Sequence, residues 1–273
     1  MTTETIRAAV RELGLAGLPL EVHAALSSFG RVEGGAATVV DALLAEGCTV
    51  VVPTFTRSPS YLIDPPETMR PERNGIDYDA LPEGRAGGEN RVFTPETNDV
   101  SATMGAIPAE VLARPERVRG SNPLCSFAAL GPLAERMREQ RPLDVYAPLR
   151  ILAAKGGWAL LIGVDLRSLT LLHLAEEKAG RRLFRRWANG PDGKPMEVEV
   201  GSCSQGFLNF EPILAPLARA TRVGESRWVA YPARELLALA ADAIREKPGI
   251  THCGDADCLR CRDAVAGGPP IST

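Results

Sequence analysis

Apolar positions along the chain follow two spacings, one typical of buried strands and one typical of helices. Apolar runs at residues 18–22, 48–56 and 156–164 have the length of buried strands, and the second is rich in β-branched residues. Between the first two runs, residues 32–47 carry apolar side chains at helical spacing and end at Gly47, a helix-terminating residue. A strand, a helix and a strand in this order predict a right-handed βαβ unit with parallel strands.

The other segments continue the alternation of helices and strands. The N-terminal segment is typical of an amphipathic helix capped by Thr2 or Thr3. An antiparallel portion is expected around residues 181–201. Further elements are expected as a helix over 104–120, a turn and an amphipathic helix over 121–140, a helix with Glu211 near its start, and a strand and helix over 225–249. We therefore expect one α/β domain over residues 1–273, with a mixed, largely parallel central sheet flanked by helices.

Residues 57–103 differ from the rest, since they are rich in Pro, Gly and acidic residues and show no sustained period. A loop of this length in a compact domain is usually functional or disordered. We interpret it as a substrate-facing excursion; the alternative for each acid is a solvated loop position. Its carboxylates include Asp64, Glu67, Asp77, Asp79 and Glu83.

Composition narrows the function classes. The 273 residues are 45% hydrophobic and 24% charged, as in globular proteins, and no apolar run approaches the ~20 residues of a membrane span. The N-terminus lacks a signal-peptide pattern, so we expect a cytoplasmic protein. A net charge of −3 argues against nucleic acid or an anionic membrane as partner and suits a cationic small-molecule amine. The chain is expected to be a monomer or a homodimer.

Six cysteines in a chain without a secretory signal are expected to be free thiols or metal ligands. Cys48, Cys125 and Cys203 lie singly in apolar surroundings, where cysteine behaves as a small buried hydrophobe. The C-terminal tail, residues 250–273, contains the run HCGDADCLRC, whose ligand types suit tetrahedral Zn²⁺. A structural zinc is therefore a possibility there, the alternative being a cysteine-rich tail without metal; the expected ligands are His252, Cys253, Cys258 and Cys261.

Residues 160–179 carry the strongest candidate chemistry. An apolar strand runs into a turn at Asp165 and then into a helix that bears His173, one of three histidines in the chain. Open α/β sheets place their sites beyond the carboxyl ends of strands, where this imidazole lies. The alternative is a histidine satisfied within the core.

Five segments, in their order and spacing, resemble the aminoglycoside N(3)-acetyltransferase family. They are VHAALSSFGRVEGGAATVVDALL (22–44), VVPTFT (51–56), MGAIPAEVLARP (104–115), NPLCSFAALGPLAE (122–135) and LLIGVDLRSLTLLHLAEEKA (160–179). The resemblance implies an α/β fold distinct from the common acetyltransferase fold, acetyl-coenzyme A as donor, and direct acetyl transfer to the 3-amino group of an aminoglycoside.

The resemblance also implies site residues. His173 matches the family's histidine, which pairs with a downstream acid matched here to Glu211; Glu176 and Glu177 compete for that role. An imidazole with an ordinary pKa near ~6.5 suits removal of a proton from an ammonium. The Thr170 hydroxyl, or backbone N–H groups around Ser27 and Ser28, are expected to face the oxyanion. Coenzyme contacts are expected from His23, Ala24, Ala25, Leu26, Ser27, Ser28, Gly30, Arg31, Gly34, Gly35 and Ser126, and substrate contacts from Thr56, Tyr61, Asp77, Asp165 and Glu176.

Several of these assignments have a plainer reading. His23 is equally consistent with a structural histidine in its turn, and Asp165 with a turn or cap residue. The chain also departs from the family pattern, with Ala24 and Ala25 in place of serines and Asn122 in place of a histidine. Two other functions therefore stay open: an acyltransferase of this fold that uses a non-aminoglycoside amine, and a non-catalytic, zinc-stabilised binding protein.

Overall fold

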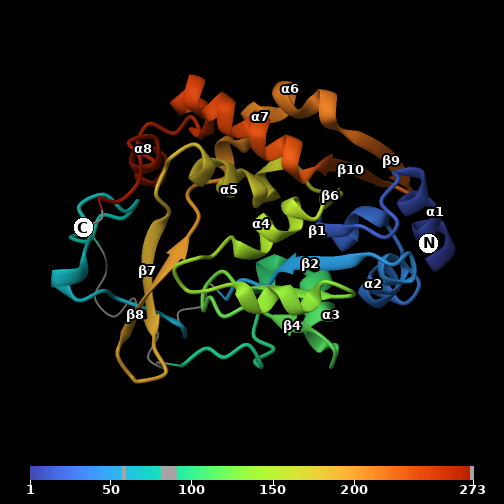
Figure 1. Cartoon of the computed structure of the whole chain (residues 1–273), viewed down its shortest axis with the longest axis horizontal. Helices are drawn as coiled ribbons and strands as arrows, with labels where there is room; N and C mark the ends of the chain where they lie inside the picture. The colour runs from blue at the N-terminus through green and yellow to red at the C-terminus, as the bar shows by residue number, and fades with distance from the viewer. Residues whose placement is uncertain (57–59, 81–90, 271–273) are drawn as a thin grey trace.

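A mixed sheet forms the centre of the computed structural model (Figure 1). The structure describes residues 1–56, 60–80 and 91–270. Strand β1 (Pro19–Ala24) lies between β2 (Thr49–Pro53) and β6 (Trp158–Ile162) and pairs parallel to both. These three strands are the apolar runs expected from the sequence, and β1, α2 (Gly35–Ala45) and β2 form the expected βαβ unit.

Antiparallel strands extend the sheet on both sides. Within the described residues the strand order is β4-β5-β2-β1-β6-β10-β9. Both outer pairs run antiparallel to their neighbours, so parallel pairing is confined to the three central strands. The outer strands are β4 (Val118–Arg119), β5 (Phe127–Leu130), β9 (Arg219–Val223) and β10 (Ser226–Pro232). The mixed α/β class expected from the sequence is confirmed.

A second, antiparallel sheet lies at one end of the molecule, at the left in Figure 1. Its hairpin, β7 (Phe184–Asn189) and β8 (Pro195–Val200), is the antiparallel portion expected around 181–201, and β3 (Leu62–Ile63) from the long excursion joins its edge. The excursion is therefore anchored to this hairpin.

Helices cover both faces of the central sheet. Side chains alternate across a strand, so Leu20 and Val22 of β1 face one layer, while Glu21 and His23 face the other. The first layer contains α1 (Thr3–Glu12), α2 and α3 (Ala106–Ala113); the second contains α4 (Ala147–Ala154), α5 (Leu171–Lys178) and α7 (Ala233–Glu246). The two polar residues of β1 therefore interrupt the second apolar layer.

Short helices complete the described chain. The α-helical ones are α6 (Glu211–Leu214) and α8 (Leu259–Val265). The 3-10 turns are η1 (Leu26–Phe29), η2 (Glu67–Met69), η3 (Ala102–Met104), η4 (Ala134–Glu139), η5 (Leu166–Ser168), η6 (Gln205–Phe210), η7 (Ala215–Leu217) and η8 (Pro248–Thr251).

Residues 121–140 differ from the expected turn and amphipathic helix. Residues 127–130 form β5, because this apolar segment pairs with β2 in the core, and only the 3-10 turn η4 follows it. The helix α4 was not expected. The N-terminal helix agrees with the prediction, since the Thr2 hydroxyl caps it by accepting from the backbone N–H of Thr5.

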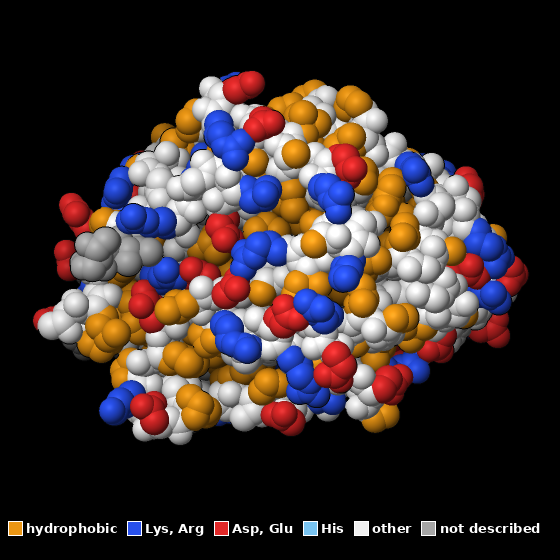
Figure 2. Space-filling model, viewed as in Figure 1, with side chains coloured by type: hydrophobic (Ala, Val, Ile, Leu, Met, Phe, Trp, Pro, Cys, Tyr) orange, Lys and Arg blue, Asp and Glu red, His pale blue; other side chains and the backbone are white. Residues whose placement is uncertain are grey.

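The surface agrees with the composition. Figure 2 shows basic and acidic side chains interspersed over the viewed face. Among the described helices, none has the length and apolarity to cross a bilayer.

Candidate active site

His173 lies in the first turn of α5, beyond the carboxyl end of β6. Gly163 ends the strand with a positive φ of 63°, and a Cβ there would lie 2.0 Å from Ser28 Oγ, so the turn requires glycine. Asp165 then caps η5 by accepting from the backbone N–H of Arg167 at 2.9 Å, and hydrogen bonding to Arg167 lowers the Asp165 pKa. Asp165 thus has the capping role for η5. The helix α5 follows, and the His173 imidazole is buried in its first turn.

A buried carboxylate orients His173. Glu176 Oε2 lies 2.9 Å from His173 Nδ1 and 2.7 Å from the Ser202 hydroxyl, while Glu176 Oε1 accepts from Arg181 Nη1 at 2.7 Å. Burial alone would raise the Glu176 pKa, but hydrogen bonding and charge from His173, with Ser202 and Arg181, outweigh burial and lower the pKa. Glu176 is therefore ionised at neutral pH.

An ionised Glu176 fixes the tautomer of the neutral imidazole. A carboxylate only accepts, so Nδ1 carries the hydrogen and Nε2 keeps its lone pair. Within the described residues, the hydrogen bonds of the ring involve Nδ1 alone. The arrangement presents a proton acceptor at Nε2 and stabilises the cation that forms once a proton is accepted.

Aromatic rings and a glycine enclose the imidazole. Tyr146 stacks parallel to the ring with centroids 6.3 Å apart, and Phe207 lies against it at 4.7 Å. A Cβ at Gly201 would lie 2.7 Å from His173 Cδ2 and 2.6 Å from the Tyr146 hydroxyl oxygen. The residue after β8 must therefore be glycine to allow this close approach.

The structure does not bring Glu211 to His173, which corrects that pairing. Glu211 is exposed at the first position of α6, whereas Glu176 occupies the Nδ1 side from the same helix as His173. Glu176 is also an expected substrate contact, but its side chain is buried and its oxygens contact His173, Ser202 and Arg181. The i,i+3 spacing of His173 and Glu176 was the available signal, since residues so spaced adjoin on a helix. Ser202 and Arg181 carried no local signal.

A cavity of about 360 Å³, here termed the β1 cavity, opens at the carboxyl end of β1. The turn after β1 supplies one wall and the start of α3 another. Five of the expected coenzyme contacts line it: His23, Ala24, Ala25, Leu26 and Ser27. Apolar and small side chains with nearby backbone amides suit a pantetheine arm and its thioester.

His23 links the β1 cavity to the start of α5. Its Nε2 accepts from the backbone N–H of Thr170 at 3.5 Å, and the Thr170 carbonyl accepts from the backbone N–H of His173 at 2.9 Å. Glu21 Oε1 lies 3.1 Å from His23 Nε2, but neither carboxylate oxygen is aligned for a hydrogen bond with a described residue. Thr170 makes no side-chain capping bond.

The remaining expected coenzyme residues lie outside the lining of the β1 cavity in the described chain. The Ser28 hydroxyl donates to the Ala25 carbonyl at 2.7 Å and contacts Ser226 Oγ at 2.7 Å, so it serves the turn. Gly30, Arg31, Gly34 and Gly35 follow η1 toward α2. Ser126 is fully buried and donates to the Thr54 carbonyl at 3.0 Å, so its position is structural rather than a coenzyme contact.

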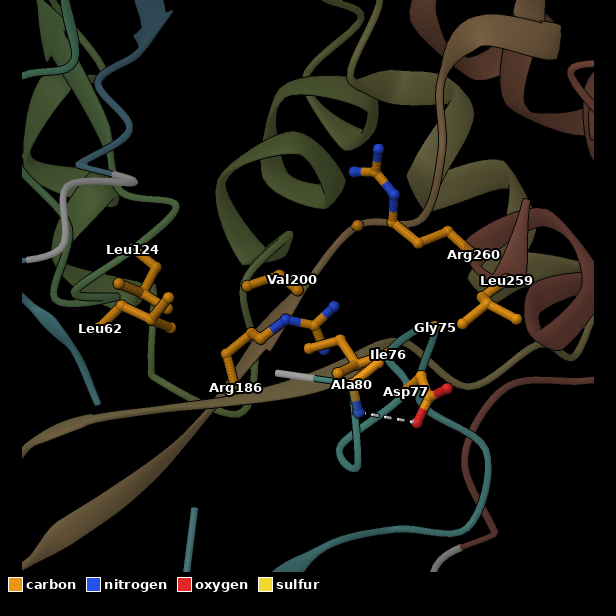
Figure 3. A pocket seen from close by; sticks show the side chains of 11 residues that line it. Leu62, Gly75, Ile76, Asp77, Ala80, Leu124, Arg186, Val200, Leu259 and Arg260 are labelled. Atoms are coloured by element: carbon orange, nitrogen blue, oxygen red, sulfur yellow. Dashed lines mark hydrogen bonds between the residues drawn. The ribbon is translucent and has the colours of Figure 1, made fainter. Parts of the chain in front are cut away.

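A larger cavity of about 580 Å³, the hairpin cavity, lies between the hairpin, the excursion and α8 (Figure 3). Gly201, which touches His173, is one of its lining residues. Its charged lining residues in the described chain are Asp77, Arg186 and Arg260, and Arg186 extends into it from β7. Asp77, an expected substrate contact, therefore lines this cavity, and its Oδ1 accepts from the backbone N–H groups of Asp79 and Ala80.

The other substrate residues expected from the sequence lie apart from the hairpin cavity. Thr56 and Tyr61 line a smaller cavity of about 190 Å³. The Thr56 hydroxyl donates to the Pro123 carbonyl, and the Tyr61 hydroxyl donates to Asp99 at 2.5 Å. Asp64 lies beside β3 and Glu67 begins η2, while Glu83 lies outside the described residues.

The cysteine-rich tail contacts Cys203, which the sequence predicts to be a small buried hydrophobe. The sulfurs of Cys203, Cys253, Cys258 and Cys261 all lie within 4.8 Å of one another. His252 is not in this cluster, because its Nδ1 accepts from the backbone N–H of Gly254 at 3.1 Å. Cys203 thus replaces His252 in the expected ligand set.

Comparison with known proteins decides the family. A family model described as aminoglycoside 3-N-acetyltransferase matches residues 22–245. The chain belongs to the aminoglycoside 3-N-acetyltransferase family. This acetyltransferase is 33% identical to aminoglycoside N(3)-acetyltransferase VII of Streptomyces paromomycinus over 258 residues, which cover 83% of this chain and 85% of that one. It is 28% identical to aminoglycoside N(3)-acetyltransferase IX of Micromonospora chalcea over 279 residues, covering 90% and 94%.

Solved structures share the fold of the acetyltransferase. The apoenzyme of AAC(3)-IVa matches with a TM-score of 0.75 at 24% identity, covering 97% of each chain. AAC-IIIb, in a binary structure with CoASH, matches with a TM-score of 0.71 at 25% identity, covering 90% of this chain and 97% of that one. The resemblance and the distinct acetyltransferase fold expected from the sequence are confirmed.

The departures from the family pattern have different surroundings. Ala24 and Ala25 line the β1 cavity, so the lost serine hydroxyls would have faced it. Asn122 is fully buried, and its Oδ1 accepts from the backbone N–H groups of Leu124 and Cys125 at 3.0 and 2.8 Å. Asn122 therefore holds a loop of the acetyltransferase.

Proposed function

We propose that this acetyltransferase transfers the acetyl group of acetyl-coenzyme A to the 3-amino group of an aminoglycoside, with His173 as general base. Two lines of support meet here. The curated relatives are named aminoglycoside N(3)-acetyltransferases, and a solved relative is named as a complex with CoASH. The observation that carries the chemistry is the His173–Glu176 pair, which leaves Nε2 as the proton acceptor.

The two cavities fit a donor and an acceptor that meet at His173. The donor thioester would enter the β1 cavity, whose wall residue His23 is linked to α5 through Thr170. The acceptor would enter the hairpin cavity, whose lining residue Gly201 touches the His173 ring. Holding both reactants beside one base removes much of the entropic barrier to a bimolecular reaction.

The proposed reaction has a balanced proton path. His173 Nε2 takes a proton from the acceptor ammonium, so that the amine lone pair can attack the thioester carbonyl. The resulting tetrahedral intermediate bears an oxyanion, for which the Thr170 hydroxyl and backbone N–H groups near Ser27 are donor candidates. Collapse breaks the C–S bond and releases the coenzyme thiolate, which takes the proton of the imidazolium. The attacking nitrogen loses its second proton to the regenerated His173 Nε2 and from there to solvent, so that the neutral amide, the free thiol and one released proton are the products. Glu176 stabilises the imidazolium throughout as a positioning residue.

An acceptor screen tests the function. Purified protein is incubated with acetyl-coenzyme A and one aminoglycoside at a time, released thiol is measured, and NMR locates the new amide. We expect thiol release that depends on an aminoglycoside and an amide at the 3-amino group. An amide at another amino group would contradict the proposed regiochemistry, and no thiol release with any aminoglycoside would contradict the acceptor class.

A specific observation favours a second acceptor class. The described charged residues that line the hairpin cavity are two guanidinium groups and one carboxylate, a balance that suits an amine with an anionic group. The alternative is therefore acetyl transfer to a non-aminoglycoside amine by the same residues. Turnover with amino acids or amino sugar acids, and none with aminoglycosides, would favour it.

A further inference from the structure

Four of the six cysteines converge from two distant parts of the chain. Cys203 follows β8, while Cys253, Cys258 and Cys261 belong to the C-terminal tail, which contains α8. Cys203 and Cys261 are buried, and the other two are half-buried, so the cluster lies just beneath the surface. Apolar packing alone does not require four thiols side by side.

We propose that these four cysteines bind one structural Zn²⁺ as a tetrathiolate. A tetrahedron of Zn–S bonds of about 2.3 Å places the sulfurs roughly 3.8 Å apart. The sulfurs already lie within 4.8 Å of one another, so metal binding needs only small side-chain movements. The spacing Cys258-x-x-Cys261 gives a ligand pair of the kind common in structural zinc sites. No ligand from outside the described chain is needed.

The surroundings of the sulfurs suit bound thiolates. The backbone N–H of Cys253 donates to Cys261 Sγ at 3.4 Å. Such contacts around the ligands offset the negative charge of four thiolates on one divalent cation.

The zinc would fasten the tail to the loop that supports His173. Ser202, next to Cys203, donates to Glu176, and Gly201 and Phe207 contact the imidazole. The loop packs closely against the tail, since a Cβ at Gly206 would lie 2.2 Å from the Thr251 carbonyl oxygen. The metal would therefore act as a positioning element, a role that rests on the proposed function, whereas the metal site itself does not.

Metal analysis of the full-length, untagged protein tests the site. We expect one zinc per chain by inductively coupled plasma mass spectrometry, and cobalt substitution is expected to give the visible spectrum of a tetrahedral tetrathiolate. Cys203→Ser and Cys258→Ser should lose the metal. Cys125→Ser, a buried cysteine outside the cluster, and His252→Ala should keep it. Metal-free protein, disulfides among these cysteines by intact mass, or zinc lost in His252→Ala but kept in Cys203→Ser would overturn the proposal.

Chelation of the wild-type protein avoids variants that fail to fold. Removal of zinc is expected to lower kcat about tenfold to a hundredfold, the usual weight of one hydrogen bond to a charged group, while coenzyme A affinity stays constant. Zinc readdition should restore kcat. An unchanged kcat in metal-free protein would overturn the positioning role. If zinc is bound but no acceptor is turned over, the proposed function fails and the metal site stands.

Discussion

Replacing Glu176 with Gln tests the network around His173 most sharply. The substitution keeps the shape of the side chain but removes the charge that lies 2.9 Å from His173 Nδ1. Two unit charges about 4 Å apart interact by roughly 4 kcal/mol at an effective dielectric constant of about 20. The imidazolium is only partly formed in the transition state, so we expect kcat/KM to fall roughly 10²- to 10³-fold at about 1.4 kcal/mol per factor of ten.

The assay is thiol release from acetyl-coenzyme A at saturating donor, over a range of pH. Without the carboxylate the ring loses the acceptor that holds its Nδ1 hydrogen, so kcat should fall at every pH while KM for the acceptor changes little. A role in folding alone would lower the rate only in proportion to the unfolded fraction.

Folding must be checked, because Arg181 loses its buried partner, and breaking such a pair costs about 3–5 kcal/mol. Circular dichroism and thermal unfolding show whether the variant is folded. Glu177→Gln is the matched control, since this neighbouring acid pairs with Arg150 instead. A folded Glu176→Gln protein with the kcat/KM and pH profile of Glu177→Gln would refute the reasoning.

Three further predictions concern activity and stability. Glu211→Gln should leave thiol release and the thermal midpoint close to wild type, because Glu211 is exposed; a large loss of rate would return this acid to the site. His23→Ala leaves the buried backbone N–H of Thr170 without its acceptor, so urea unfolding should report a loss of about 1–3 kcal/mol; an unchanged midpoint would contradict this. The pKa of Glu176 is lower in the folded chain than in the unfolded chain, where it is about 4.3, so ionised Glu176 stabilises the fold fully above a pH of about 4.3. This stabilisation is lost as pH falls through the lower pKa of the folded chain. Unfolding measured across acidic pH should therefore show a steeper loss of stability in wild type than in Glu176→Gln.

Local pattern was enough to predict the centre of the fold. The runs that became β1, β2 and β6 are buried on both faces, and such strands carry an apolar signal. Residues 127–130 were missed because a short apolar run does not distinguish a strand from a helix, and β5 is defined by its pairing with β2.

Only part of the candidate site was predictable from local sequence pattern. His173 and the turn after β1 were identifiable because each follows a strand along the chain. Ser202 and Cys203 reach their partners only through tertiary packing, and Ser202 lies 26 residues from Glu176 along the chain. Arg181 contacts Glu176 from the turn after α5, at a sequence separation of 5 residues. The family resemblance points to Glu211, whereas the helical spacing of His173 and Glu176 indicates the contact that the structure has.

The central claim is that His173 is the base for acetyl transfer. The most direct measurement is kcat/KM of His173→Ala for an aminoglycoside turned over by the wild type, together with the Kd for coenzyme A. We predict a fall in kcat/KM of about 10²- to 10⁴-fold with the coenzyme Kd unchanged. A general base ordinarily contributes about 10²- to 10⁴-fold to the rate. A folded His173→Ala protein that keeps more than about a tenth of the wild-type rate would therefore contradict the role of His173 as the base.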